Sequence, residues 1–198
     1  MRSCSAIVLA GGRATRLGGI NKASLEVGGT SLLDRVLGAL EPLADQIVVV
    51  GRLAEGVERP GVEVASDAFP GGGTLVGIYS GLLAARNDLA LVVGCDMPFL
   101  STPLLERIAV LAEGHDLAVP RVGQHLEALH AAYRRSCLSA MRDAIERGQL
   151  KIIDIYPRLR VREVGEGEMR DLDPELRSFF NVNTPVDLEL ARSLALAS

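Results

Sequence analysis

Short apolar runs rich in β-branched residues alternate along this chain with segments whose apolar residues recur at helical spacing. The runs span residues 6–9, 46–50, 62–64, 89–93, 117–119, 128–133 and 160–164, and the helical segments span 31–40, 75–85, 103–111, 136–147 and a last one from 185. Such alternation predicts an α/β sandwich built on a mostly parallel sheet. The polar turn 121–125 between two of the runs indicates a hairpin, and hence one antiparallel strand.

Parallel strands place their carboxyl ends at one edge of a sheet, and ligands bind in the loops along that edge. The loops after Leu9, Val50, Val64 and Val93 are therefore where we expect the functional residues.

Three details of the helices carry further expectations. Gly77, Ser80 and Gly81 fall on one side of helix 75–85, which predicts close packing on the sheet. We expect Thr102 to cap helix 103–111, with proline tolerated in its first turn. The sequence TPVD, at 184–187, resembles a capping box in which aspartate replaces the usual glutamate.

Composition excludes several classes of protein. The 198 residues are 48% apolar and 23% charged, as in an ordinary globular chain, and we expect a single domain over 1–198. No apolar run approaches a membrane span, and the short run at 6–10 is no signal-peptide core, so we expect a cytoplasmic protein. A net charge of −4 without a basic stripe argues against nucleic-acid or membrane-surface binding. Cys4, Cys95 and Cys137 lack C-x-x-C spacing and are predicted to be free and buried.

The first loop, LAGGRATRLGGINKAS at 9–24, joins a buried strand to two glycine pairs, two arginines and Lys22. Glycines let backbone N–H groups approach a polyphosphate, and cationic side chains neutralise its charge. Lysine is otherwise scarce, since all but two of the 21 basic residues are arginine. The alternative is a solvated surface turn, but the preceding strand favours a phosphate-binding loop.

Two carboxylates follow other strands of the predicted sheet. Asp96 lies just past strand 89–93, where one carboxylate together with phosphate oxygens suits Mg²⁺, and Pro98 would stiffen its turn. The alternative role, capping helix 103–111, places Asp96 too far upstream. Asp67 ends strand 62–64 and is explained equally well by a turn or by ligand contact.

Four ordered motifs resemble those of the MobA-like nucleotidyltransferases. The pattern L-A-G-G-x-x-x-R-M-G-x-x-K is met at 9–22 with Leu17 for methionine and with three residues, not two, between Gly18 and Lys22. The other motifs are SDAFPGGGTLVGI (66–78), CDMPFL (95–100) and FFNVNTPVDL (179–188). The last resembles the molybdenum cofactor guanylyltransferases most closely. The resemblance implies a three-layer Rossmann-like fold of the nucleotide-diphospho-sugar transferase type. It also implies transfer of GMP from GTP to the molybdenum cofactor (molybdopterin), with release of pyrophosphate.

The resemblance also assigns residues. Arg16, Lys22 and Asp96 are implied to be catalytic, and Asp96 is implied to bind Mg²⁺. The implied binding residues for nucleotide and acceptor are Leu9, Ala10, Gly11, Gly12, Gly19, Lys22, Gly51, Asp67, Gly73, Gly77, Asp96, Asn181 and Asn183. Asn183 is otherwise explained as a turn residue before Thr184. Other molybdenum-cofactor biosynthesis proteins, or acceptor molybdoenzymes, are the candidate protein partners.

The chain departs from the guanylyltransferase pattern at three positions. Gly51 stands where asparagine is frequent, Asn21 replaces an aspartate, and Thr74 replaces a proline. These differences predict a GTP preference with weakened discrimination, and they leave open cytidylyl or other nucleotidyl transfer to the same cofactor or to a phosphorylated metabolite. A nucleotide-binding adaptor without turnover is the alternative from another class.

The remaining candidates are weaker. His115, His125 and His130 lack metal-ligand spacing, so we expect each to be exposed or hydrogen-bonded. Lys151 is expected at the surface, with contact to an acceptor phosphate as the alternative.

Overall fold

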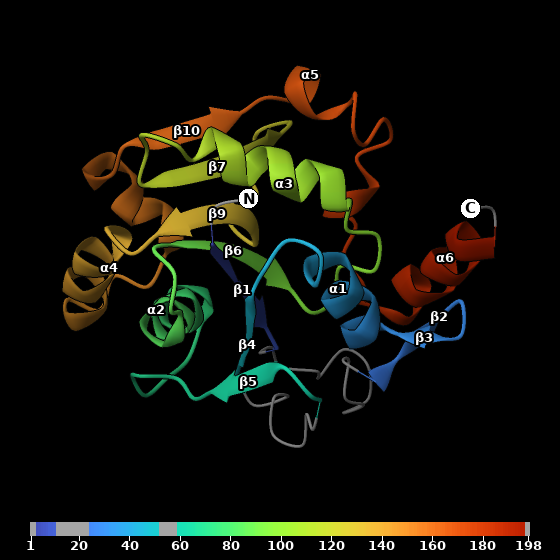
Figure 1. Cartoon of the computed structure of the whole chain (residues 1–198), viewed down its shortest axis with the longest axis horizontal. Helices are drawn as coiled ribbons and strands as arrows, with labels where there is room; N and C mark the ends of the chain where they lie inside the picture. Colours follow the sequence, from blue (N-terminus) through green and yellow to red (C-terminus); the bar gives the residue numbers. More distant parts are fainter. Residues whose placement is uncertain (1–2, 11–23, 52–58, 197–198) are drawn as a thin grey trace.

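A mixed sheet of eight strands runs through the part of the chain that the structure, a computed structural model, describes: residues 3–10, 24–51 and 59–196 (Figure 1). Its main path is β10 (Val161–Val164), β7 (Leu117–Val122), β9 (His130–Arg134), β6 (Leu89–Gly94), β1 (Cys4–Leu9), β4 (Gln46–Val50) and β5 (Val62–Ala65), with β8 (His125–Leu126) beside β7. Strand β9 runs antiparallel to β6 and β7, and β8 is antiparallel to β7. The predicted α/β class and mostly parallel sheet are therefore confirmed.

The antiparallel strand β9 lies inside the sheet, between β6 and β7, where it separates two parallel blocks. It begins at His130, two residues later than the apolar pattern indicates, because residues 127–129 form a turn. In that turn the Glu127 N–H donates to the Pro120 carbonyl over 2.9 Å. Apolar side chains alone did not reveal this turn.

Helices cover both faces of the sheet and leave its carboxyl edge to loops. The structure gives α1 (Leu32–Leu40), α2 (Thr74–Ala84), α3 (Thr102–Leu111), α4 (Cys137–Glu146), α5 (Glu166–Met169) and α6 (Pro185–Leu196), with 3₁₀ segments η4 (Ile152–Arg158) and η5 (Arg177–Phe179). Helices α1 and α3 pack on one face and α2 and α4 on the other (Figure 1). Helix α6 packs with a small hairpin, β2 (Glu26–Val27) and β3 (Thr30–Ser31).

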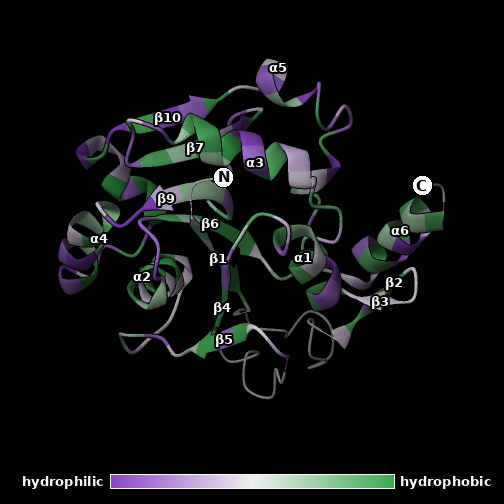
Figure 2. Cartoon of the chain, viewed as in Figure 1, coloured by the Kyte–Doolittle hydropathy of each residue, from purple (hydrophilic) through white to green (hydrophobic). Residues whose placement is uncertain are grey.

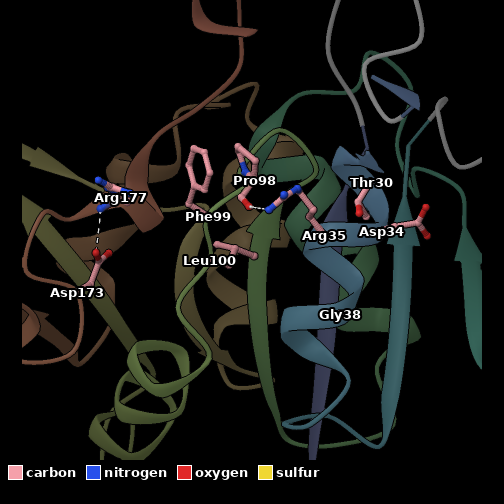
Figure 3. A pocket seen from close by; sticks show the side chains of 9 residues that line it. All are labelled: Thr30, Asp34, Arg35, Gly38, Pro98, Phe99, Leu100, Asp173 and Arg177. Atoms are coloured by element: carbon pink, nitrogen blue, oxygen red, sulfur yellow. Dashed lines mark hydrogen bonds between the residues drawn. The ribbon is translucent and has the colours of Figure 1, made fainter. Parts of the chain in front are cut away.

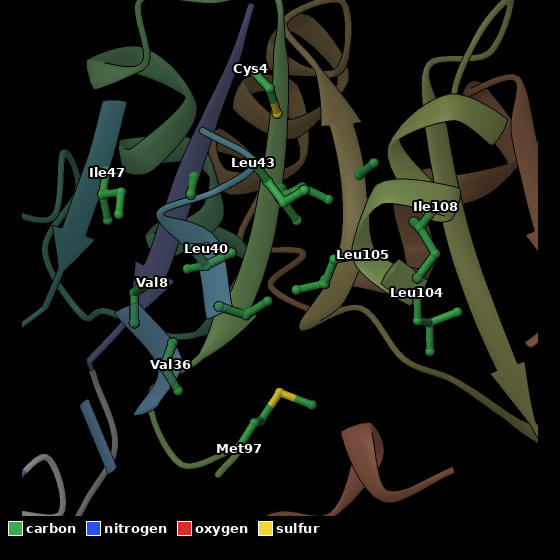
Figure 4. Close-up of a cluster of buried hydrophobic side chains, with 14 of the residues drawn as sticks. Cys4, Val8, Val36, Leu40, Leu43, Ile47, Met97, Leu104, Leu105 and Ile108 are labelled. Atoms are coloured by element: carbon green, nitrogen blue, oxygen red, sulfur yellow. The ribbon is translucent and has the colours of Figure 1, made fainter. Parts of the chain in front are cut away.

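The apolar run at residues 6–9 of β1 follows from this sandwich. Ala6 and Val8 face the α1–α3 core, whereas Ile7 and Leu9 face the α2–α4 core, so every residue of the strand is buried. Figure 4 shows part of the α1–α3 core, where Leu40 and Leu105 lie over the sheet. Helix α4, by contrast, turns hydrophilic residues outward (Figure 2).

The helix ends confirm one expectation and correct another. Thr184 and Asp187 cap α6 reciprocally: the Asp187 N–H donates to the Thr184 hydroxyl, and the Thr184 N–H to the Asp187 carboxylate. For α3, however, the cap is Ser101, whose hydroxyl accepts from the Leu104 N–H over 3.3 Å. Thr102 is instead the first helical residue, and its hydroxyl donates to the Ala39 carbonyl of α1.

Close packing of α2 on the sheet is also confirmed. A Cβ added at Gly81 would lie 2.4 Å from Ile7 Cγ2, and one at Gly77 would lie 3.3 Å from the methyl carbons of Leu9. Among the described residues, every helix is too short or too polar to cross a membrane.

Candidate active site

Three parallel strand ends come together at the carboxyl edge of the sheet. Leu9 of β1 is in register with Val50 of β4 on one side and Gly94 of β6 on the other. Backbone bonds continue past the strands, from Ala10 N to the Val50 carbonyl (2.8 Å) and from Cys95 N to the Leu9 carbonyl (3.1 Å). The start of the glycine-rich loop is thus held directly between the ends of β4 and β6.

Several predicted site residues fall outside the described residues. They are Gly11, Gly12, Arg16, Gly19 and Lys22. Their roles stay predictions.

Asp96 lies half-buried just beyond β6. Its carboxylate occupies the space beside Gly94, where an added Cβ would come within 2.7 Å of Asp96 Oδ1. Gly94 therefore leaves room for the carboxylate at the strand end. In the described part of the chain, no group of three or more His, Cys, Asp or Glu side chains converges. A single cradled carboxylate fits Mg²⁺, which takes its other ligands from phosphate and water, and does not fit a closed structural metal site.

The segment with the two asparagines lies against the Asp96 loop. Val182 N donates to the Asp96 carbonyl over 2.9 Å, so a residue between Asn181 and Asn183 is bonded to the loop from the other end of the chain. Asn181 is half-buried and its Nδ2 donates to the Phe179 carbonyl, whereas Asn183 is exposed at the start of α6. The structure thus brings Asp96, Asn181 and Asn183 to one place.

The residues expected on the nucleotide side follow β4 and β5. Gly51, directly after β4, has a backbone φ of +111°. An asparagine residue rarely adopts this backbone conformation. Asp67 is exposed after β5, and Gly73, at φ +105°, is the N-cap residue of α2. Gly77 contacts Leu9 from the next turn of α2, so its packing role is explained by the fold.

His130 differs from the expectation. It is fully buried, and neither ring nitrogen makes a hydrogen bond within the described part of the chain. Its ring packs against Phe179, with centroids 4.6 Å apart. Burial lowers the pKa of His130 to about 4, against the opposing influence of the Asp173 carboxylate and the Ser178 backbone. His130 is therefore a neutral buried side chain, neither exposed nor hydrogen-bonded.

Asp173 and Ser178 fasten the C-terminal segment to the loop after Asp96, a link that the sequence did not reveal. The buried Asp173 carboxylate accepts from the backbone N–H groups of Arg177 and Ser178. The Ser178 hydroxyl accepts from Ser101 N and donates to the Phe99 carbonyl. No periodic pattern marks Ser178, because its partners Ser101 and Phe99 lie 77 and 79 positions away.

A cavity of about 540 Å³ lies beside this link, between α1 and residues 98–100 (Figure 3). Arg35 of α1 reaches across it, with Nε donating to the Val27 carbonyl and Nη1 lying 3.5 Å from the Pro98 carbonyl. Arg35 therefore joins α1, the β2–β3 hairpin and the Asp96 loop, and supports the site from outside.

The remaining candidates are structural or at the surface. Cys4, Cys95 and Cys137 are buried and form no disulfide with one another. Burial raises the pKa of Cys4 to about 11 and that of Cys137 to about 12, so both of these thiols stay neutral. His115 is half-buried beside the Glu113 carbonyl. His125 and Lys151 are exposed.

Comparison with known proteins assigns the family. A model of the MobA-like NTP transferase domain matches residues 6–161. A probable molybdenum cofactor guanylyltransferase from Pelotomaculum thermopropionicum is 41% identical, covering 98% of this chain and 95% of that protein. A molybdenum cofactor guanylyltransferase from Desulfosudis oleivorans is 36% identical, with 98% and 96% covered.

A solved structure agrees with these sequence relatives. Molybdopterin-guanine dinucleotide biosynthesis protein A from Archaeoglobus fulgidus superposes with a TM-score of 0.86 at 32% identity, covering 98% of this chain and all of that one. The edge geometry, the sequence relatives and this fold match lead to one assignment: the chain is a nucleotidyltransferase and belongs to the MobA-like NTP transferase family, with the molybdenum cofactor guanylyltransferases as its relatives.

Proposed function

We propose that this protein transfers GMP from GTP to the molybdenum cofactor, molybdopterin, and releases pyrophosphate. The observation that carries the proposal is the position of Asp96, cradled by Gly94 beside the start of the glycine-rich loop and bonded through its carbonyl to Val182. The relatives' names support the choice of substrates.

Positioning is the main task of the protein in such a transfer. Arg16 and Lys22 are proposed to hold the triphosphate and to stabilise the departing pyrophosphate. The terminal phosphate of the acceptor attacks the α-phosphorus in line, the bond to the bridging oxygen breaks, and pyrophosphate leaves. The attacking phosphate is already anionic near neutral pH, so no general base is required.

Asp96 would hold Mg²⁺, which when bound neutralises charge on the phosphate oxygens. Asn181 and Asn183 are proposed to contact the acceptor, because their segment is bonded to the Asp96 loop. The buried thiols of Cys4 and Cys137 suit a reducing compartment, so we place the reaction in the cytoplasm. Enzymes that make molybdopterin, and the molybdoenzymes that take the product, are the proposed protein partners.

Recognition of guanine requires acceptors that face its N1–H and N2–H₂ groups. The Leu9 carbonyl already accepts from Cys95 N. The exposed Asp67 carboxylate at the end of β5 is therefore the stronger candidate, with backbone carbonyls near Leu9 and Ala10 completing the contact.

Asp96→Asn tests the proposal, because it keeps the shape of the side chain and removes its charge. We expect the Mg²⁺ concentration for half-maximal pyrophosphate release to rise at least tenfold, while the melting temperature stays within about 2 °C. The control is Asp171→Asn, at an exposed position, which should leave the Mg²⁺ titration unchanged. An unaltered titration for Asp96→Asn would place the metal elsewhere.

A further inference from the structure

A second carboxylate, that of Glu127, lies at the same sheet edge as Asp96, beyond the neighbouring strand β9. Strands β6 and β9 are neighbours, with Val93 in register with His130. Asp96 follows Val93 by three residues, and Glu127 precedes His130 by three. Because β9 is antiparallel to β6, both residues lie just outside the same edge of the sheet, on adjacent strands.

The turn that carries Glu127 is fixed by backbone bonds on every side. Glu127 N donates to the Pro120 carbonyl (2.9 Å), and the Glu127 carbonyl accepts from His130 N (3.0 Å). Ala128 N donates to the Leu126 carbonyl, and the buried Tyr133 hydroxyl donates to the Ala128 carbonyl over 3.0 Å. The backbone at Glu127 is therefore held in one position at this edge of the sheet.

Among the described residues, the Glu127 carboxylate has no protein group bound to it. It is half-buried, yet no group within the described residues donates a hydrogen bond to it or forms an ion pair with it. Arg121, whose strand pairs with Leu126, is already bound to Glu163 at 2.6 and 2.8 Å. Burial raises the pKa of Glu127, with His125 opposing the shift. A carboxylate partly removed from water without a partner costs free energy, and such residues concentrate at binding sites.

Apolar side chains flank this carboxylate. Leu126 and Leu129 are both half-buried, and both pack against the α2–α4 core from the edge. Apolar side chains beside a carboxylate suit a flat ring that carries N–H donors on its rim. Two adjacent N–H groups on that rim are the partners that a carboxylate binds best.

We propose that Glu127 recognises the acceptor, binding the amino group and the neighbouring ring N–H of a pterin-like heterocycle. This inference rests on the proposed function. Guanine has the same donor pair, but the two rings would bind at different places along the sheet edge, on opposite sides of β6. The glycine-rich loop, Gly51 and Asp67 follow β1, β4 and β5, on one side of β6, whereas Glu127 lies on the β9 side. The nucleotide and the acceptor thus approach Asp96 from opposite sides.

The test is Glu127→Gln, with Glu106→Gln on the exposed surface of α3 as the matched control. Glu127→Gln should raise the KM for molybdopterin roughly tenfold to a hundredfold, as expected when hydrogen bonds to a charged group are lost. It should leave the KM for GTP within twofold. Glu106→Gln should change neither. An unchanged KM for molybdopterin would overturn the inference, and a raised KM for GTP alone would mean that Glu127 reads guanine instead.

A binding experiment separates this inference from the proposed reaction. Pterin and lumazine differ in that lumazine carries an oxygen in place of the 2-amino group. By fluorescence titration the wild type should bind pterin at least tenfold more tightly than lumazine, and Glu127→Gln should remove most of that preference. Equal preferences in the two proteins would overturn the role of Glu127 even if GMP transfer proceeds. If Glu127→Gln loses the preference for pterin but the wild type transfers no GMP, the pterin site stands and the proposed reaction is wrong.

Discussion

At the scale of single residues, Lys22 is the most specific prediction from the sequence. Lys22→Ala should lower kcat/KM about 100- to 1,000-fold, because one preorganised charge on the transferring phosphates is lost. The melting temperature should not change. Arg142→Ala is the control, since it removes an exposed cation that forms a surface ion pair with Glu146 within α4. If Lys22→Ala keeps an activity within a few-fold of wild type, Lys22 does not bind the phosphates and is only a solvated loop residue.

His130 makes stability depend on pH. Its pKa is about 4 in the folded protein and near 6.5 in the unfolded chain, so between these values the unfolded chain binds more protons. Stability is therefore complete above pH 6.5 and falls as the pH drops toward 4, by roughly 2 kcal/mol at pH 5.

His130→Leu should abolish this loss, because leucine does not titrate. At pH 8 the variant should be about as stable as the wild type, since the imidazole nitrogens make no hydrogen bond with the described residues. Urea unfolding at pH 8, 6 and 5 measures the effect, with the half-buried His115→Gln as control. Parallel pH profiles for wild type and His130→Leu would contradict the assignment.

At the scale of elements, the contact between α2 and β1 determines how the α2–α4 layer sits on the sheet. Gly81→Ala should destabilise the protein by about 1–3 kcal/mol, because its Cβ would lie 2.4 Å from Ile7 Cγ2 in a fully buried strand. The gain in helix propensity, about 1 kcal/mol, does not offset this clash.

Gly38→Ala is the matched control for the element-scale prediction. Gly38 also lies within a helix, α1, but nothing approaches its added Cβ within 4 Å. The same substitution there should stabilise by about 0.5–1 kcal/mol. Thermal unfolding of both variants measures the two effects. Equal shifts in melting temperature for Gly81→Ala and Gly38→Ala would contradict close packing at Gly81.

At the scale of the whole molecule, nucleotide choice depends on several loops that converge from separate strands. We expect GTP to be preferred over CTP and ATP in kcat/KM at fixed acceptor. The margin should be smaller than in a site with asparagine at position 51, because Gly51 offers no side chain. A higher kcat/KM with CTP than with GTP would contradict the assignment as a guanylyltransferase, although the protein would still be a nucleotidyltransferase.

The sequence by itself determined the layers of the fold and the edge that carries the site. Strand β1 had to be buried on both faces, because an unbroken apolar run cannot present one face to water. The helix start at Thr184–Asp187 was likewise predictable, since both partners of a capping box lie within one turn of chain. Asp96 was identifiable because it directly follows a buried strand.

Only the tertiary structure decided which distant residues meet. The choice of Ser101 over Thr102 as cap of α3 followed from the contact of Thr102 with Ala39, a partner 63 positions away. The burial of His130 depended on Phe179 packing against it from the far end of the chain. The placement of Glu127 at the same sheet edge as Asp96 depended on β9 lying next to β6. Local sequence encodes periodicity and caps, whereas burial and long-range hydrogen bonds depend on which elements become neighbours.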